Sequence, residues 1–79
     1  MKNQQEFIQN FASQFDETDA SIFTIETRFK ELDEWSSLIS LAELNMIAKN
    51  YGVKLTPEEM KRSQTLQELY NLILSKKQQ

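Results

Sequence analysis

The stretch SSLISLAELNMIAKNYG, residues 36–52, decides the fold. Two serines stand at its start, a glycine stands at its end, and apolar side chains recur between them with no proline. At 100° per residue, one face of such a helix holds a continuous apolar stripe. The stripe consists of Leu41, Leu44, Ile47, Ala48 and Tyr51. We therefore expect a helix over residues 37–51 that turns this stripe toward the core and stops at Gly52.

Residues 3–15 predict a helix that precedes this one. Its apolar side chains recur at helical spacing, and Asn3 with Glu6 is a candidate capping pair. The apolar positions are Phe7, Ile8, Phe11 and Phe15. An acidic connection follows over residues 16–35 and has no sustained helical period. We expect it to be held against the core at intervals, with a short helical turn near its end, because a long structureless loop is rare in a small domain. The anchors are Ile22, Phe23, Ile25, Phe29, Leu32 and Trp35.

Two more helices are predicted after Gly52. The sequence TPEE, residues 56–59, combines a capping threonine, a proline at the first helical position and a glutamate three residues after the cap. It predicts a short helix over residues 57–62. TLQE, residues 65–68, repeats the cap and opens a last helix that carries Leu66, Leu69, Tyr70 and Ile73.

These elements predict an all-α fold, a small four-helix bundle with a long first loop and a short third helix. The chain has 79 residues, which is one domain at most, and we read residues 1–79 as a single domain. One glycine and one proline argue against a β-rich domain with many tight turns. The expected shared core is Leu41, Leu44, Ile47, Leu66, Leu69 and Ile73.

Composition disfavours several classes of function. The chain has no cysteine and no histidine, so zinc sites and hydrolases of the triad type are not expected. The net charge is −3 and no basic stripe is present, which disfavours nucleic acid as a partner. No apolar run is long enough to span a membrane, and the N-terminal residues do not resemble a signal peptide. We expect a monomeric cytoplasmic protein that is not an enzyme.

Residues 29–73 resemble the acyl carrier proteins. The sequence is FKELDEWSSLISLAELNMIAKNYGVKLTPEEMKRSQTLQELYNLI. The resemblance rests on the spaced apolar residues before Ser36, on Ser37-Leu38, on residues 51–53 and on Thr65-Leu66. The usual Asp-Ser-Leu motif reads Ser36-Ser37-Leu38 here. Two serines alone would indicate a helix cap and nothing more. It is the set of motifs at these spacings that carries the resemblance.

The resemblance implies a 4'-phosphopantetheine arm esterified to Ser37. A serine at a helix N-terminus offers an accessible hydroxyl, and the free backbone N–H groups and the dipole there favour a phosphate. Ser36 would take the capping role, and Leu38 would anchor the turn. The arm's thiol would carry an acyl group as a thioester, so a protein without cysteine can take part in thioester chemistry. By position in the family, Ile47, Leu55 and Met60 would line the acyl pocket.

The implied partners are a phosphopantetheinyl transferase, an acyl-loading ligase or transferase, and synthase enzymes. In the family, basic partner enzymes read acidic side chains on the second helix. Here Glu43 is the only acid between Ser37 and Tyr51. We expect Ile39, Ala42 and Met46 to form an exposed apolar strip there instead, although the short helix or the loop would cover them in a second arrangement. This departure suggests a specialised fatty-acid or polyketide pathway. An aminoacyl or peptidyl carrier, and a helical interaction module without a prosthetic group, stay open as alternatives.

Overall fold

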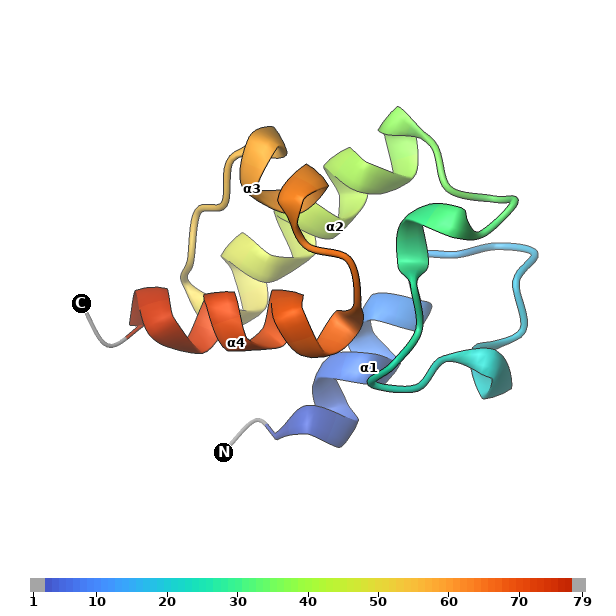
Figure 1. Ribbon diagram of the computed structural model, residues 1–79, viewed down its shortest axis with the longest axis horizontal. Helices are drawn as coiled ribbons and strands as arrows, with labels where there is room; N and C mark the ends of the chain where they lie inside the picture. Colours follow the sequence, from blue (N-terminus) through green and yellow to red (C-terminus); the bar gives the residue numbers. More distant parts are fainter. Residues whose placement is uncertain (1–2, 78–79) are drawn as a thin grey trace.

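All regular elements of the described chain are helical. The structure, a computed structural model, describes residues 3–77. Its helices are α1 (Gln4–Ala12), α2 (Ser37–Tyr51), α3 (Pro57–Arg62) and α4 (Leu66–Lys77), with 3-10 turns η1 (Ala20–Ile22) and η2 (Phe29–Glu31) between α1 and α2. Helix α2 packs against α1 and α3, and α1 packs against α4 (Figure 1). The predicted fold class, with its long first loop and short third helix, is confirmed.

Local capping chemistry fixes where the helices begin and end. The Asn3 side chain accepts a hydrogen bond from the Glu6 backbone N–H at 2.9 Å, as predicted. Thr56 and Glu59 form a complete capping box at the start of α3. Gly52 ends α2 with φ of 69°, a left-handed conformation that costs glycine little. Helix α1 ends at Ala12, three residues before the predicted end at Phe15.

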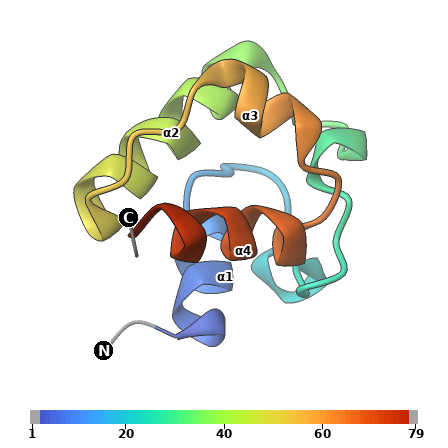
Figure 2. The same ribbon diagram turned by 60° about the vertical axis from the view of Figure 1, so that its left-hand side comes forward.

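The start of α4 is tied to the long connection. Thr65 accepts from the Glu68 N–H, but the Glu68 carboxylate accepts from the Gln64 N–H rather than closing the predicted box on Thr65. The N–H groups of Leu66 and Gln67 donate to the carbonyls of Thr27 and Ile25. These bonds satisfy N–H groups that a helix start leaves unpaired. They hold the middle of the connection against α4, on the side away from the start of α1 and the end of α4 (Figures 1 and 2).

Aromatic rings fill much of the core. Phe11 is fully buried, and its ring lies within 6.4 Å, between centroids, of the rings of Phe7, Phe15, Phe23, Phe29 and Trp35. The Phe7 ring in turn contacts the rings of Tyr51 in α2 and Tyr70 in α4. The connection therefore contributes rings to the centre of the molecule. Ile22, one of its expected anchors, is 50% exposed, so that expectation was wrong.

The Glu34 carboxylate holds the first part of this connection. It accepts hydrogen bonds from the backbone N–H groups of Asp16, Glu17 and Thr18 and from the Thr18 hydroxyl, at 2.7 to 3.2 Å. The Thr18 hydroxyl, together with these backbone groups, keeps the pKa of Glu34 below its usual value. A single side chain just before α2 therefore fixes the chain just after α1.

The face that α2 turns to the core differs from the predicted stripe. Ile47 and Tyr51 are buried as expected, but Leu41 is 55% exposed and Leu44 and Ala48 are only partly buried. The remaining buried positions of α2 are Glu43 and Met46. The prediction failed because apolar residues occur almost all round this helix, so a helical wheel does not select one face. Packing against both α1 and α3 selects it instead.

Candidate functional site

Ser36 and Ser37 have different roles at the start of α2. Ser36 is the N-cap, and its hydroxyl accepts a hydrogen bond from the Ile39 N–H at 3.2 Å, as predicted. Ser37 is the first helical residue, is exposed, and its hydroxyl makes no hydrogen bond with residues 3–77. Because Ser36 already serves as the cap, the Ser37 hydroxyl is available to an external reagent at the positive end of a 15-residue helix.

An open groove of about 510 Å³ lies beside Ser37. One wall comes from α2, the other from α3, and the end next to η2 carries Trp35 and Lys30. The lining side chains are Lys30, Trp35, Ser36, Ser37, Ser40, Leu41, Leu44, Pro57, Met60 and Lys61. Met60 is almost fully buried, so the floor of the groove reaches the core. The groove thus combines a free hydroxyl at its edge, apolar walls and two lysines, and it contains no carboxylate among its lining residues.

The residues predicted for the acyl pocket divide between the groove and the core. Met60 lines the groove. Ile47 and Leu55 are buried in the core and are not among the lining residues. Sequence reasoning missed Trp35, Leu41 and Pro57 as groove residues. The sequence signal that could have indicated them was position: Trp35 and Leu41 lie within four residues of Ser37, and Pro57 begins the short helix.

The predicted exposed strip on α2 is not exposed. Met46 is only 6% exposed, and Ile39 packs against the core with part of its side chain accessible. Ala42 has intermediate exposure. These side chains are covered because this side of α2 faces α1 and the aromatic core. The exposed apolar side chains of α2 are Leu38, at 78%, and Leu41, at 55%. Leu38 therefore does not anchor the turn, as the resemblance implied that it would. The apolar surface next to Ser37 therefore exists, but on different residues.

Glu43 is a buried carboxyl group that the sequence pattern did not reveal. The residue is 0% exposed, and neither carboxylate oxygen has a hydrogen-bond partner among the described residues. Burial raises the pKa of this carboxyl from 4.5 to about 10. A group with that pKa is neutral at pH 7, so α2 presents no negative charge from Glu43. The available signal was its angular position, between Ile39 and Ile47 on the wheel.

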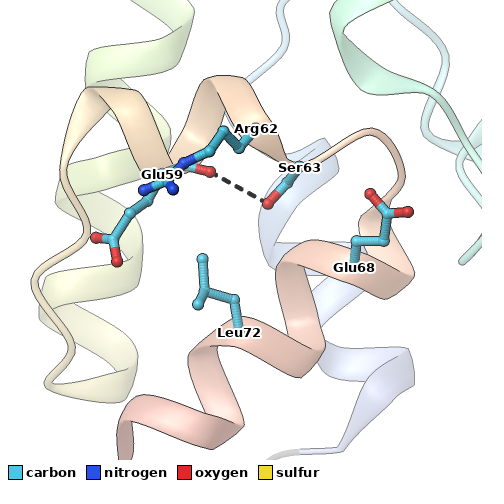
Figure 3. Close-up of a pocket in the computed structure, with 5 residues that line it drawn as sticks. All are labelled: Glu59, Arg62, Ser63, Glu68 and Leu72. Atoms are coloured by element: carbon cyan, nitrogen blue, oxygen red, sulfur yellow. Dashed lines mark hydrogen bonds between the residues drawn. The ribbon is translucent and has the colours of Figure 1, made fainter.

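A second pocket, between α3 and α4, is occupied by structural interactions. Figure 3 shows Glu59, Arg62 and Ser63 above Glu68 and Leu72 of α4. The Ser63 hydroxyl donates to the Glu59 carbonyl at 3.2 Å, and the Glu59 carboxylate pairs with Lys76 at 2.8 Å. Glu68 accepts from the Gln64 N–H. Of these interactions, the Glu59–Lys76 ion pair joins α3 to α4, and the other two fix the end of α3 and the start of α4.

Comparison with known proteins gives no family assignment: no family model, no curated protein and no solved structure matches the chain. Within residues 3–77, no helix has the length and apolar character needed to cross a membrane. The same range contains no group of three or more Asp or Glu side chains placed to hold a metal ion.

Proposed function

We propose that this protein is a carrier of acyl intermediates, with a 4'-phosphopantetheine arm attached to Ser37. The observation that carries the proposal is the free Ser37 hydroxyl at the N-terminus of α2, at the edge of an apolar groove between α2 and α3. The arm brings a terminal thiol, which holds an acyl group as a thioester. The chain itself supplies a place of attachment and a groove, and it performs no catalytic step.

The residues around Ser37 fit such a group. The hydroxyl is exposed, and it lies where unpaired N–H groups and the helix dipole stabilise a phosphodiester. Trp35, Leu44 and Met60 provide apolar surface for the uncharged part of the arm or its acyl group. Serine in place of the usual aspartate at position 36 keeps the cap through its own hydroxyl. It also leaves the edge of the site without a negative charge at this position.

Partner enzymes would meet an apolar surface beside Ser37. Leu38 and Leu41 are exposed there, and the one acid within α2, Glu43, is buried and neutral at pH 7. A phosphopantetheinyl transferase, a loading ligase or transferase and a synthase would therefore gain buried apolar area rather than ion pairs with α2. This surface supports a carrier for a specialised fatty-acid or polyketide pathway. The loading enzyme chooses the cargo, so an aminoacyl or peptidyl carrier would use the same site.

Intact-mass analysis tests the attachment. Incubation with coenzyme A and a broad-specificity phosphopantetheinyl transferase should add one phosphopantetheine. In this transfer the Ser37 oxygen bonds to phosphorus, the nucleotide half of coenzyme A leaves, and the transferase takes the serine proton. Ser37→Ala should add none. Ser36→Ala is the matched control, and it should still be modified with a destabilised helix start of about 1 kcal/mol.

Two results would contradict the proposal. Modification of Ser37→Ala but not Ser36→Ala would place the attachment one residue earlier. Failure of the folded wild-type chain to take up any arm would favour the helical interaction module without a prosthetic group. Circular dichroism of the same samples shows that each variant is folded before its mass is interpreted.

A further inference from the structure

The charge at the mouth of the Ser37 groove is entirely positive. Lys30, from η2, and Lys61, from α3, both line the groove, and none of the other lining residues is acidic. The N-terminus of α2 adds the positive end of its dipole at the same place. An apolar groove with a cationic mouth is suited to a ligand that is apolar along its length and carries an oxyanion.

The two lysines differ in whether their ammonium groups already bind another part of the chain. The Lys30 ammonium donates to the backbone carbonyl of Lys61, which ties η2 to the end of α3. The Lys61 ammonium forms no hydrogen bond or ion pair with the described residues. It is exposed and therefore free to bind an anion. A purely structural explanation for a lysine here is a favourable interaction with the C-terminal dipole of α3. Arg62, in the same last turn, makes the same interaction.

We propose that Lys30 and Lys61 form an oxyanion-binding site that draws the attached arm back into the groove. This inference rests on the proposed function, since Ser37 must carry the arm. The oxyanion has two sources with the same chemistry, the phosphodiester at Ser37 and a carboxylate at the far end of the cargo. Binding of either one keeps the uncharged part of the arm, or its acyl group, against Trp35, Leu44 and Met60. The lysines are positioning residues and touch no reacting atom.

Trp35 reports the state of the groove. It is the only tryptophan of the chain and lines the groove directly. Acrylamide quenching of its fluorescence should fall when the arm occupies the groove. Four matched states are compared: the chain without an arm, and the chain to which the transferase has attached a free arm, a butyryl arm or a succinyl arm. Butyryl and succinyl groups both contain four carbons and differ in whether the far end is a methyl group or a carboxylate.

The variants separate anion binding from helix stabilisation. Lys61→Gln and Lys30→Gln should each weaken the arm's protection of Trp35, with an about two- to fivefold change in the equilibrium between bound and extended arm. Arg62→Gln is the matched control, because Arg62 is also in the last turn of α3 but lines the other pocket. High salt should reduce wild-type protection toward that of Lys61→Gln, because it screens exposed charges.

Each outcome decides the proposal. A loss of protection in all armed states of Lys61→Gln assigns the site to the phosphodiester, and a loss confined to the succinyl state assigns it to the cargo carboxylate. Either result supports an oxyanion site. The inference is overturned if Trp35 is quenched equally with and without the arm, or if Lys61→Gln behaves as Arg62→Gln. A chain that takes up no arm overturns the proposed function instead, and intact mass reveals this before any fluorescence is measured.

Discussion

Glu43 is an acidic residue whose carboxyl group is buried in the core instead of lying in water. An isolated carboxyl group without a hydrogen-bond partner costs free energy in an apolar core, and it avoids the larger cost of a buried charge by staying protonated. Burial holds its pKa at about 10 in the folded chain, against 4.5 for an ordinary glutamate. From pH 4.5 to about 10 the folded chain therefore keeps a proton that the unfolded chain releases.

We predict that stability falls as pH rises through this window. The free energy of unfolding should decrease by up to about 1.4 kcal/mol per pH unit between pH 6 and 8. No histidine titrates there, and the carboxyls with lowered pKa, those of Asp19, Glu34 and Glu59, are ionised in both states. Glu43→Met should abolish the slope and stabilise the protein at pH 8. Urea unfolding at three pH values measures this, with Glu26→Met as an exposed control; a flat wild-type profile would contradict it.

Among the elements, the helix starts were predictable and the orientation of α2 was not. A cap involves groups within a few residues, so Asn3, Ser36 and Thr56 could be recognised from local sequence. The side of α2 that faces the core depends on what α1 and α3 cover, and a helix with apolar residues all round leaves this undetermined. The Ser37 position was predicted, whereas the groove's lysines come from elements distant in sequence and had no local signal.

The Glu34 carboxylate holds the first part of the connection between α1 and α2. We predict that Glu34→Ala exposes the backbone N–H groups of Asp16, Glu17 and Thr18 to hydrogen exchange, because their acceptor is lost. The Thr18 hydroxyl and these backbone groups hold the pKa of Glu34 below 4.5, so wild-type protection should be complete above that pH and disappear as pH falls through the lowered value. Glu31→Ala is the control, since Glu31 makes only an exposed ion pair with Arg28 at 3.8 Å. Equal exchange rates in the two variants would show that the Glu34 carboxylate does not protect these N–H groups.

At the scale of the whole molecule, the aromatic cluster joins the connection to the helices. Phe11 of α1 contacts rings from the connection, namely Phe23, Phe29 and Trp35, and Phe7 extends the cluster to α2 and α4 through Tyr51 and Tyr70. A chain of 79 residues buries a small core, so few side chains share the stabilisation. Trp35 belongs both to this cluster and to the Ser37 groove. A change in the packing of Trp35 would therefore affect both the core and the groove.

Truncation of Phe11 should consequently affect the whole fold. Phe11→Ala removes a fully buried ring at a cost of about 3–5 kcal/mol, against a total stability of roughly 5–15 kcal/mol for a domain. Since 1 kcal/mol shifts the melting temperature of a domain of this size by about 4–8 °C, we expect a decrease of more than about 12 °C, with loss of the near-ultraviolet signal of Trp35. Leu41→Ala is the control, because Leu41 is 55% exposed and its truncation should change stability by less than about 0.5 kcal/mol. Thermal melting by circular dichroism compares the two variants. A Leu41→Ala protein that melts as early as Phe11→Ala would show that α2 turns Leu41 toward the core, as the sequence pattern alone predicts.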